Sequence, residues 1–96
     1  MERVVDYIRN HGSIDKPVMN HEISAHLKIG EVKIRKLINQ ARCEGHPICS
    51  CHKGYFYSEN KADIIETIRG LNNRTIAVEK AISGLLTNLI GLEEEE

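Results

Sequence analysis

The sequence predicts a mainly α-helical protein with a small β-hairpin, in which one long C-terminal helix follows a small domain. Three observations predict this class: apolar residues at helical spacing before residue 45, two short runs of β-forming residues around a glycine, and a heptad pattern in the last third of the chain. With 96 residues, the chain suffices for one hydrophobic core and one extra helix, but not for two independent cores.

The N-terminal residues predict a helix and then an extended segment. The apolar stripe between residues 2 and 11 consists of Val4, Val5 and Ile8. This spacing is typical of an amphipathic helix, and Gly12 is a suitable residue to end it. Pro17 lies between short apolar positions in residues 13–19, which favours a brief extended segment over a helix.

Two more helices are predicted before residue 45. Asn20 is a good N-cap for the first of them, whose inward-facing residues are Ile23 and Leu27. A tight turn at Ile29-Gly30 leads into the second, which is predicted from Glu31 to about Glu44. The apolar face of this second helix consists of Ile34, Leu37, Ile38 and Ala41.

After Gly45 the pattern changes to that of a hairpin. The runs HPICS and YFYS are rich in β-forming residues, and CHKG between them includes Gly54, which suits a turn. Ser58 then opens a final helical stretch. We therefore expect a domain at residues 1–58, an oligomerisation helix at residues 59–92 and an acidic tail at residues 93–96.

The final stretch has the most regular pattern of the chain. Its residues at alternating spacings of four and three are Ile64, Ile68, Leu71, Thr75, Val78, Ile82, Leu85, Leu89 and Leu92. Four heptads with one polar break, at Thr75, predict a coiled coil, which needs another chain to cover its seam. The predicted dimerisation residues are Ile64, Ile68, Leu71, Val78, Ile82, Leu85 and Leu89.

Three alternatives to a simple two-stranded coil remain open. Gly70 costs helix propensity, so residues 70–73 are a candidate break between two helices. Apolar residues outside the seam widen its face and allow a tetramer; they are Ile65, Ile76, Leu86 and Ile90. The helix could also fold back on its own core. For a dimer, the parallel orientation is favoured because it brings Arg74 opposite Glu79 of the partner subunit.

The net charge conceals a division along the chain. The formal charge of −1 and the aromatic content of 4%, with no Trp, argue against a basic nucleic-acid binder and a stacking platform for single strands. Residues 1–58, however, hold nine Lys or Arg against six Asp or Glu, and residues 59–96 hold four against eight. The basic excess therefore lies in the predicted domain.

The helix that begins at Glu31 has a basic, amide-bearing front opposite its apolar face. Its outward residues are Val32, Lys33, Arg35, Lys36, Asn39, Gln40, Arg42 and Cys43. Lys and Arg bind phosphates or guanine edges, and Asn or Gln pairs with adenine, so this front suits the DNA major groove. The competing interpretation is an ordinary solvated helix face.

The segment from Asn20 onward resembles a known fold, in the stretch NHEISAHLKIGEVKIRKLINQARCEGHPICSCHKGYFYSEN. The turn at Ile29-Gly30, the EGHPI exit from the following helix and the wing closing in Gly54-Tyr55 are similar to the winged helix-turn-helix at the N-terminus of biotin repressors and related small bacterial and phage regulators. The resemblance covers about residues 1–58 and specifies fold more closely than function.

The resemblance implies a division of roles on DNA. The residues that it places in the major groove are Val32, Lys33, Arg35, Lys36 and Gln40. At the tip of the wing, His52 and Lys53 would approach phosphate or the minor groove. No counterpart of the biotin ligase domain follows residue 58, so the resemblance carries over neither that activity nor its effector.

A cluster of potential zinc ligands has a simpler explanation. It consists of Cys43, His46, Cys49, Cys51 and His52. The spacing is not that of a C-x2-C pair, and buried thiols are ordinary core residues, so we favour structural cysteines and expect no metal or cofactor. Metal binding or redox sensing is the alternative.

Catalysis and membrane binding have little support in the sequence. No histidine lies in a motif that combines a nucleophile, a base and an orienting acid, so we expect no enzymatic activity. We also expect no membrane partner and a cytoplasmic location, because the N-terminus has no signal-peptide core and no apolar run approaches the 18 or more residues of a membrane span.

Together these patterns predict a sequence-specific double-stranded DNA-binding protein, a dimeric transcriptional regulator of bacterial or phage type. The near alternative is an accessory DNA-binding protein of phage replication or recombination. The alternative from another class is a winged-helix module that binds proteins and not DNA. Steep loss of affinity with salt would distinguish DNA binding from that module.

Overall fold

The computed structural model describes residues 1–95 and is mainly α-helical with one β-hairpin, as the sequence predicts. Its elements, in chain order, are α1 (Glu2–His11), α2 (Asn20–Leu27), α3 (Glu31–Cys43), β1 (Ile48–Cys51), β2 (Gly54–Tyr57) and α4 (Lys61–Glu95). The final helix thus begins at Lys61 and continues through the predicted acidic tail as far as Glu95. Glu96 lies outside the described residues.

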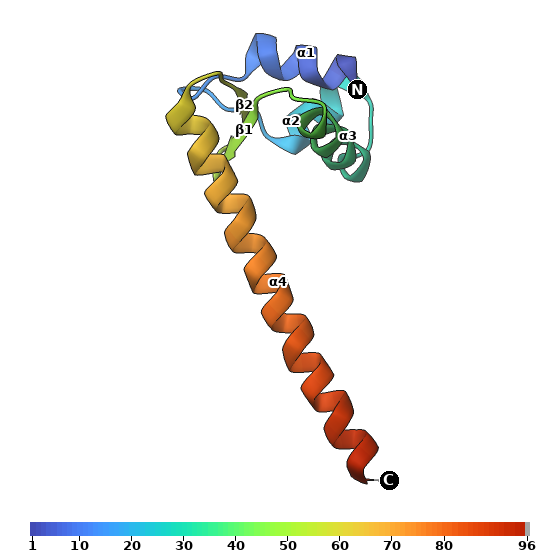
Figure 1. The fold of residues 1–96 in the computed structure, drawn as a ribbon. Helices are drawn as coiled ribbons and strands as arrows, with labels where there is room; N and C mark the ends of the chain where they lie inside the picture. The colour runs from blue at the N-terminus through green and yellow to red at the C-terminus, as the bar shows by residue number, and fades with distance from the viewer. Residues whose placement is uncertain (96) are drawn as a thin grey trace.

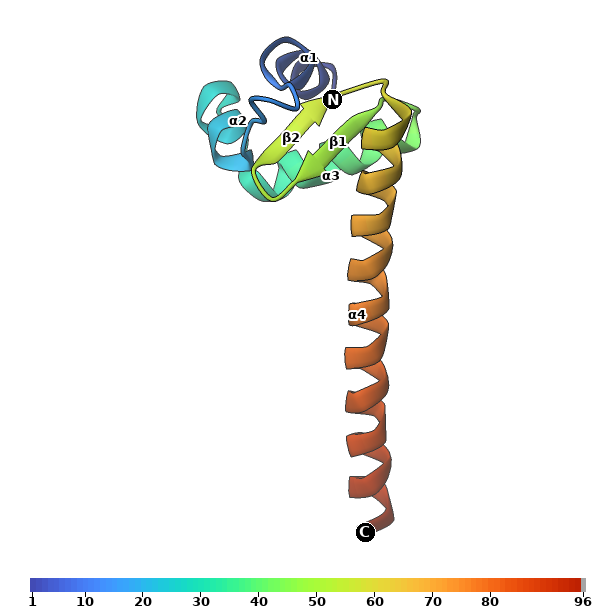
Figure 2. The same cartoon turned by 90° about the vertical axis from the view of Figure 1, so that its left-hand side faces the viewer.

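Two parts are distinct in shape (Figures 1 and 2). Residues 1–58 form a small packed unit, here called the head, and α4 projects from it on the side opposite α1. We call residues 72–95 of α4 the rod, because every described side chain from Asn72 to Glu94 is exposed. The helix therefore does not fold back on the core, and the molecule measures 58 × 32 × 23 Å.

The hydrophobic core of the head draws on all of its elements. Its buried residues are Val4, Val5, Ile8, Val18, Ile23, Ile34, Ile38, Ala41 and Ile48. The predicted stripe of α1 and most of the predicted apolar face of α3 are therefore confirmed, while Leu27 and Leu37 lie partly buried against the core. Amphipathic spacing explains this arrangement, since each helix turns one face inward.

The connection between α2 and α3 is a tight turn. Lys28 has the left-handed conformation, with φ 58°, and donates its N–H to the carbonyl of Ser24 at 2.8 Å. The hydroxyl of Ser24 donates to the carbonyl of Ile29. The predicted N-cap role of Asn20 is wrong: Met19 occupies that position, and the Asn20 amide donates to the carbonyl of Glu31 at 3.1 Å. Asn20 thus joins the starts of α2 and α3.

The hairpin is antiparallel, with a two-residue turn at His52 and Lys53. The extended segment predicted before α2 contributes a single bridge, in which Val18 exchanges both backbone hydrogen bonds with Tyr55 at 2.7 and 2.8 Å. Gly54 makes this approach possible. Its φ is +132°, and a side chain there would collide with the carbonyl group of Val18.

We expect Gly54→Ala to destabilise the head by about 2 kcal/mol, because the new Cβ combines a strained φ with displacement of the Val18 bridge. Gly70→Ala is the control. Gly70 lies in α4, where an added Cβ would meet no atom within 4 Å beyond its chain neighbours and the backbone of its own helix, so this change should stabilise the helix by about 1 kcal/mol. Urea unfolding measures both, followed by tyrosine fluorescence for Gly54→Ala and by far-UV circular dichroism for Gly70→Ala. Equal stability of Gly54→Ala and the wild type would show that the bridge is dispensable.

The first turns of α4 attach it to the hairpin. The Asn60 side chain accepts the N–H of Ala62 at 2.9 Å, which caps the helix at its start. Thr67 is buried, and its hydroxyl accepts the backbone N–H of Ser50 in β1 at 3.2 Å. The helix then continues without interruption through residues 70–73, so the break considered at Gly70 is not found.

Candidate nucleic-acid interface and self-association surface

The outward face of α3 carries cations and amides that are available to a ligand. The exposed residues there are Val32, Lys33, Arg35, Lys36, Asn39 and Gln40. Helical periodicity sets this face opposite the buried Ile34 and Ile38. The two ion pairs within the described residues are Arg9–Asp6 and Arg69–Glu66, so neither uses a cation of α3.

The tip of the hairpin adds two exposed residues near the start of α3. His52 and Lys53 are exposed at the turn between β1 and β2. Gly54 beside them approaches the backbone of Val18, and Asn20 bonds the carbonyl of Glu31. These contacts bring the hairpin tip to the N-terminal end of α3, where Val32 and Lys33 lie.

Arg42 differs from the other predicted DNA-binding residues. Its side chain is half-buried, and its Nε–H donates to the carbonyl of Ile48 at 2.8 Å. The guanidinium carbon lies 5.9 Å from the centroid of the Tyr55 ring. Burial lowers the pKa of Arg42, and the positive charge of Arg74 lowers it further. The structure therefore directs Arg42 toward α4 and not toward the outward face of α3.

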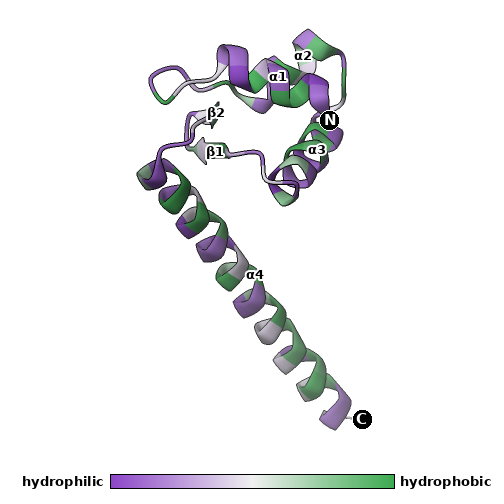
Figure 3. Cartoon of the chain, turned by 45° about the horizontal axis from the view of Figure 1, so that its top comes forward, coloured by the Kyte–Doolittle hydropathy of each residue, from purple (hydrophilic) through white to green (hydrophobic). Residues whose placement is uncertain are grey.

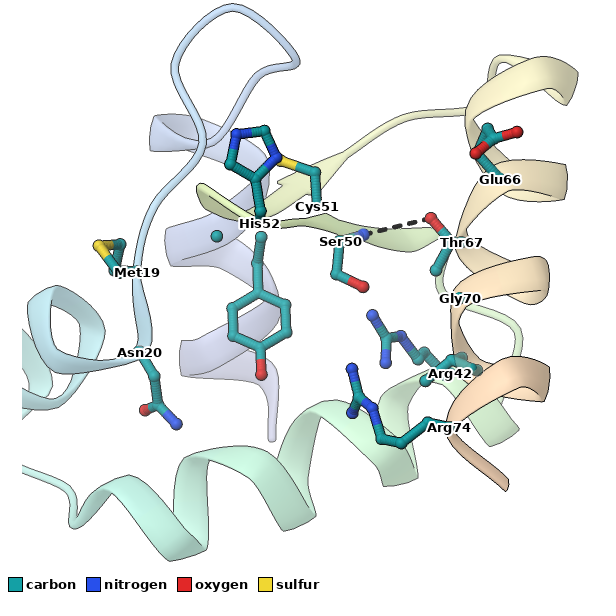
Figure 4. A pocket seen from close by; sticks show the side chains of 13 residues that line it. Met19, Asn20, Arg42, Ser50, Cys51, His52, Glu66, Thr67, Gly70 and Arg74 are labelled. Atoms are coloured by element: carbon teal, nitrogen blue, oxygen red, sulfur yellow. Dashed lines mark hydrogen bonds between the residues drawn. The ribbon is translucent and has the colours of Figure 1, made fainter. Parts of the chain in front are cut away.

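A cavity of about 410 Å³ lies where α3, the hairpin and α4 meet. Figure 4 shows that Arg42 from α3 and Arg74 from α4 both extend into it. Sequence reasoning missed this cavity, because it joins residues that are distant in the chain. Arg74, which a parallel dimer would bring opposite Glu79 of the partner subunit, also lines this cavity, and that pairing stays a prediction.

Beyond the head, exposed apolar residues recur along α4 at heptad spacing with a polar break at Thr75, and green segments accordingly recur along this helix in Figure 3. Of the predicted dimerisation residues, those more than half exposed are Ile68 (58%), Val78 (53%), Ile82 (53%), Leu85 (68%) and Leu89 (52%). Ile64 and Leu71 are half-buried and line a second cavity, of about 320 Å³, between α4 and residues 45–49. An exposed apolar face of this length is typical of an interaction surface.

The cysteines and histidines do not gather into a metal site within the part of the chain that the structure describes. Cys49 is buried, with 1% of its surface exposed, and its thiol lies 3.9 Å from the carbonyl of Ser58. Cys43 and Cys51 are exposed and unpaired by disulfides. Cys49 therefore fits the predicted structural role of a core residue, whereas that prediction is wrong for Cys43 and Cys51, whose side chains face solvent.

By length and composition alone, α4 is also apolar enough to cross a membrane. Over Lys61–Glu94 its most apolar window has a mean hydropathy of 1.3, and none of that window is buried. One such helix is weak evidence for a membrane span, so the expected absence of a membrane partner stays a prediction.

Comparison with protein families, curated proteins and solved structures found no match.

Proposed function

We propose that the chain is a sequence-specific double-stranded DNA-binding protein that acts as a homodimer, with α3 as the recognition helix. The outward face of α3 carries this proposal, because Lys33, Arg35, Lys36, Asn39 and Gln40 are exposed together on one helix. Cations suit phosphates and guanine edges, and amides suit adenine, so one helix supplies both positioning and base contacts.

The arrangement around α3 supports a winged helix-turn-helix. The head has three helices, a tight turn between α2 and α3, and a hairpin whose strand β2 also bridges Val18. In such a domain, the second helix of the helix-turn-helix enters the major groove and the hairpin contacts the adjacent backbone. His52 and Lys53, exposed at the hairpin tip, suit that contact.

The rod supports dimerisation with a second copy of the chain. Its exposed apolar residues follow the heptad spacing of a coiled coil, and Glu79 and Lys80 near the middle of α4 oppose membrane insertion. A parallel pair places both heads at one end, as two half-sites about one turn of DNA apart require. An antiparallel pair would separate them by roughly the rod's length.

The proposed role is transcriptional regulation of bacterial or phage type, with an accessory role in phage replication or recombination as the near alternative. Both roles need a bound duplex, so selection from a random pool of duplexes is the decisive experiment. Enrichment of a palindrome supports a two-fold symmetric dimer on DNA. Failure to enrich any duplex contradicts the proposal.

We expect Lys36→Ala to weaken binding of the selected duplex about tenfold and to reduce the salt dependence of affinity by about one phosphate contact. Lys36 lies on the outward face of α3, so its removal leaves the core unchanged. Lys80→Ala, on the rod, removes the same charge and should leave affinity unchanged. Fluorescence anisotropy at several salt concentrations measures both, and equal affinity of Lys36→Ala and wild type would contradict the role of α3.

The exposed rod favours one second candidate, a protein-interaction module without DNA binding. In that case the apolar face of α4 binds another protein and the head is a scaffold. Salt distinguishes the two, because contacts to phosphates lose affinity steeply as salt rises. A chain that stays monomeric and sediments with lipid vesicles would contradict both candidates and assign α4 to the membrane.

A further inference from the structure

The cavity between α3, the hairpin and α4 has the features of a binding site for an anion. Two guanidinium groups, those of Arg42 and Arg74, enter it from different helices (Figure 4). Ser50 and Asn20 add polar groups to its lining, and Tyr55 adds an aromatic ring. A volume of about 410 Å³ is within the range of small-molecule sites.

Arg42 is held in place by the protein but is incompletely satisfied. Its Nε–H is bonded to the carbonyl of Ile48, which fixes the plane of the guanidinium. Its Nη2 atom is buried and has no hydrogen-bond partner among the residues that the structure describes. A buried cationic donor without an acceptor is unfavourable, and an anion bound in the cavity against the same guanidinium group would offset part of this cost by its charge.

Arg74 brings a second positive charge to the same space. Its side chain is exposed, and neither of the ion pairs seen in residues 1–94 includes it. Glu66, the acidic residue of the lining, is already paired with Arg69 at 3.1 Å. Two neighbouring guanidinium groups repel each other, and an anion between them removes that repulsion.

We infer that this cavity binds a small organic anion, whose phosphate or carboxylate group lies between Arg42 of α3 and Arg74 of α4. Guanidinium groups bind both oxyanions with paired, charge-assisted hydrogen bonds. Asn20 and Ser50 are placed to bond the rest of the molecule. A DNA backbone phosphate is a poorer occupant, because the guanidinium group of Arg42 is directed at the hairpin and not at the outward face of α3.

Such a ligand would strengthen the junction between the head and α4. The principal packing of α4 on the head is against β1, and a bound anion would connect it to α3 as well. Where the proposed function holds, the ligand would alter DNA affinity by fixing how the two heads sit on their rod. The binding site itself is tested without DNA, so either proposal can fail alone.

The test is titration of the full-length protein with sodium phosphate and, separately, sodium citrate, against sodium chloride at matched ionic strength. The Arg42 Nε–H is hydrogen-bonded, so its NMR resonance is a direct probe of the cavity. We expect saturable displacement of this resonance by phosphate or citrate and none by chloride. The anion that displaces the resonance identifies phosphate or carboxylate as the preferred group. If neither phosphate nor citrate displaces it at concentrations up to tens of millimolar, the inference is overturned.

Arg74→Gln should weaken anion binding about tenfold, the cost of one charge-assisted bond. Lys80→Gln is the matched control, because Lys80 lies on the same helix outside the cavity and the change removes the same charge without altering the Arg69–Glu66 pair. An equal loss of anion affinity in the two variants would reveal a general effect of charge and would contradict the proposed site. A short duplex that displaces the Arg42 resonance without added anion would assign the cavity to DNA phosphate and overturn a small-molecule ligand.

Discussion

Leu85→Asp is expected to convert the proposed dimer into monomers at micromolar concentration. Leu85 lies in the heptad seam and is 68% exposed in the single chain, so a partner must cover it. A carboxylate there would be buried without a cation in each subunit. This costs about 3 kcal/mol, which weakens the dimer roughly 150-fold. Sedimentation velocity measures the change in mass.

Loss of the dimer should also unfold much of the rod. Most helical stability in proteins comes from packing of an apolar face, and no described side chain between Asn72 and Glu94 is buried in the single chain. Circular dichroism should therefore report lower helicity for Leu85→Asp. Thr87→Asp adds the same charge on the outer side of α4 and should remain dimeric and helical. A dimeric Leu85→Asp, or a monomeric wild type, would contradict the proposed seam.

Ile34→Ala is expected to destabilise the head by about 3 kcal/mol. Ile34 is fully buried at the centre of the core, so its truncation removes apolar contacts and leaves a cavity. A domain of this size is stabilised by only about 3–5 kcal/mol, so the variant should be partly unfolded at 37 °C. The protein's three tyrosines all lie in the head, so tyrosine fluorescence during urea unfolding reports on the head alone.

Val32→Ala provides the matched control on the same helix. Val32 is 62% exposed on the opposite face, so its truncation should change stability by no more than about 0.5 kcal/mol. Similar losses for the two variants would mean that α3 is not oriented as described. Because α3 would then turn a different face outward, that result would also remove the basis for assigning Lys36 to DNA.

Local patterns predicted most elements of the head correctly. The stripe at Val4 and Ile8, the outward face of α3 and the hairpin around Gly54 all depend on spacing within a few residues. Such spacing is set by the 3.6-residue turn of a helix or by the needs of one tight turn. It can therefore be read before any tertiary contact is known.

Tertiary contacts account for what the sequence could not predict. Asn20 is a suitable helix cap by residue type, but α3 starts alongside it and the amide bonds Glu31 instead. Arg42 and Arg74 lie far apart in the chain and meet because Thr67 docks on Ser50. A single hydroxyl on an otherwise regular helix gives no periodic pattern, so neither this contact nor the cavity beside it could be inferred.

The continuity of α4 has a geometric consequence for the pair of heads. Thr67, which fastens the head, and Ile68, which begins the exposed seam, are neighbours on one unbroken helix, about 100° apart around its axis. In a parallel pair, one side of α4 holds the head and another side forms the seam. The angle between these two sides therefore fixes how each α3 is oriented toward the DNA. Because α4 is unbroken, a rotation of the seam is passed on as far as the junction of Thr67 with Ser50, and that junction is where the angle between the two recognition helices would be set.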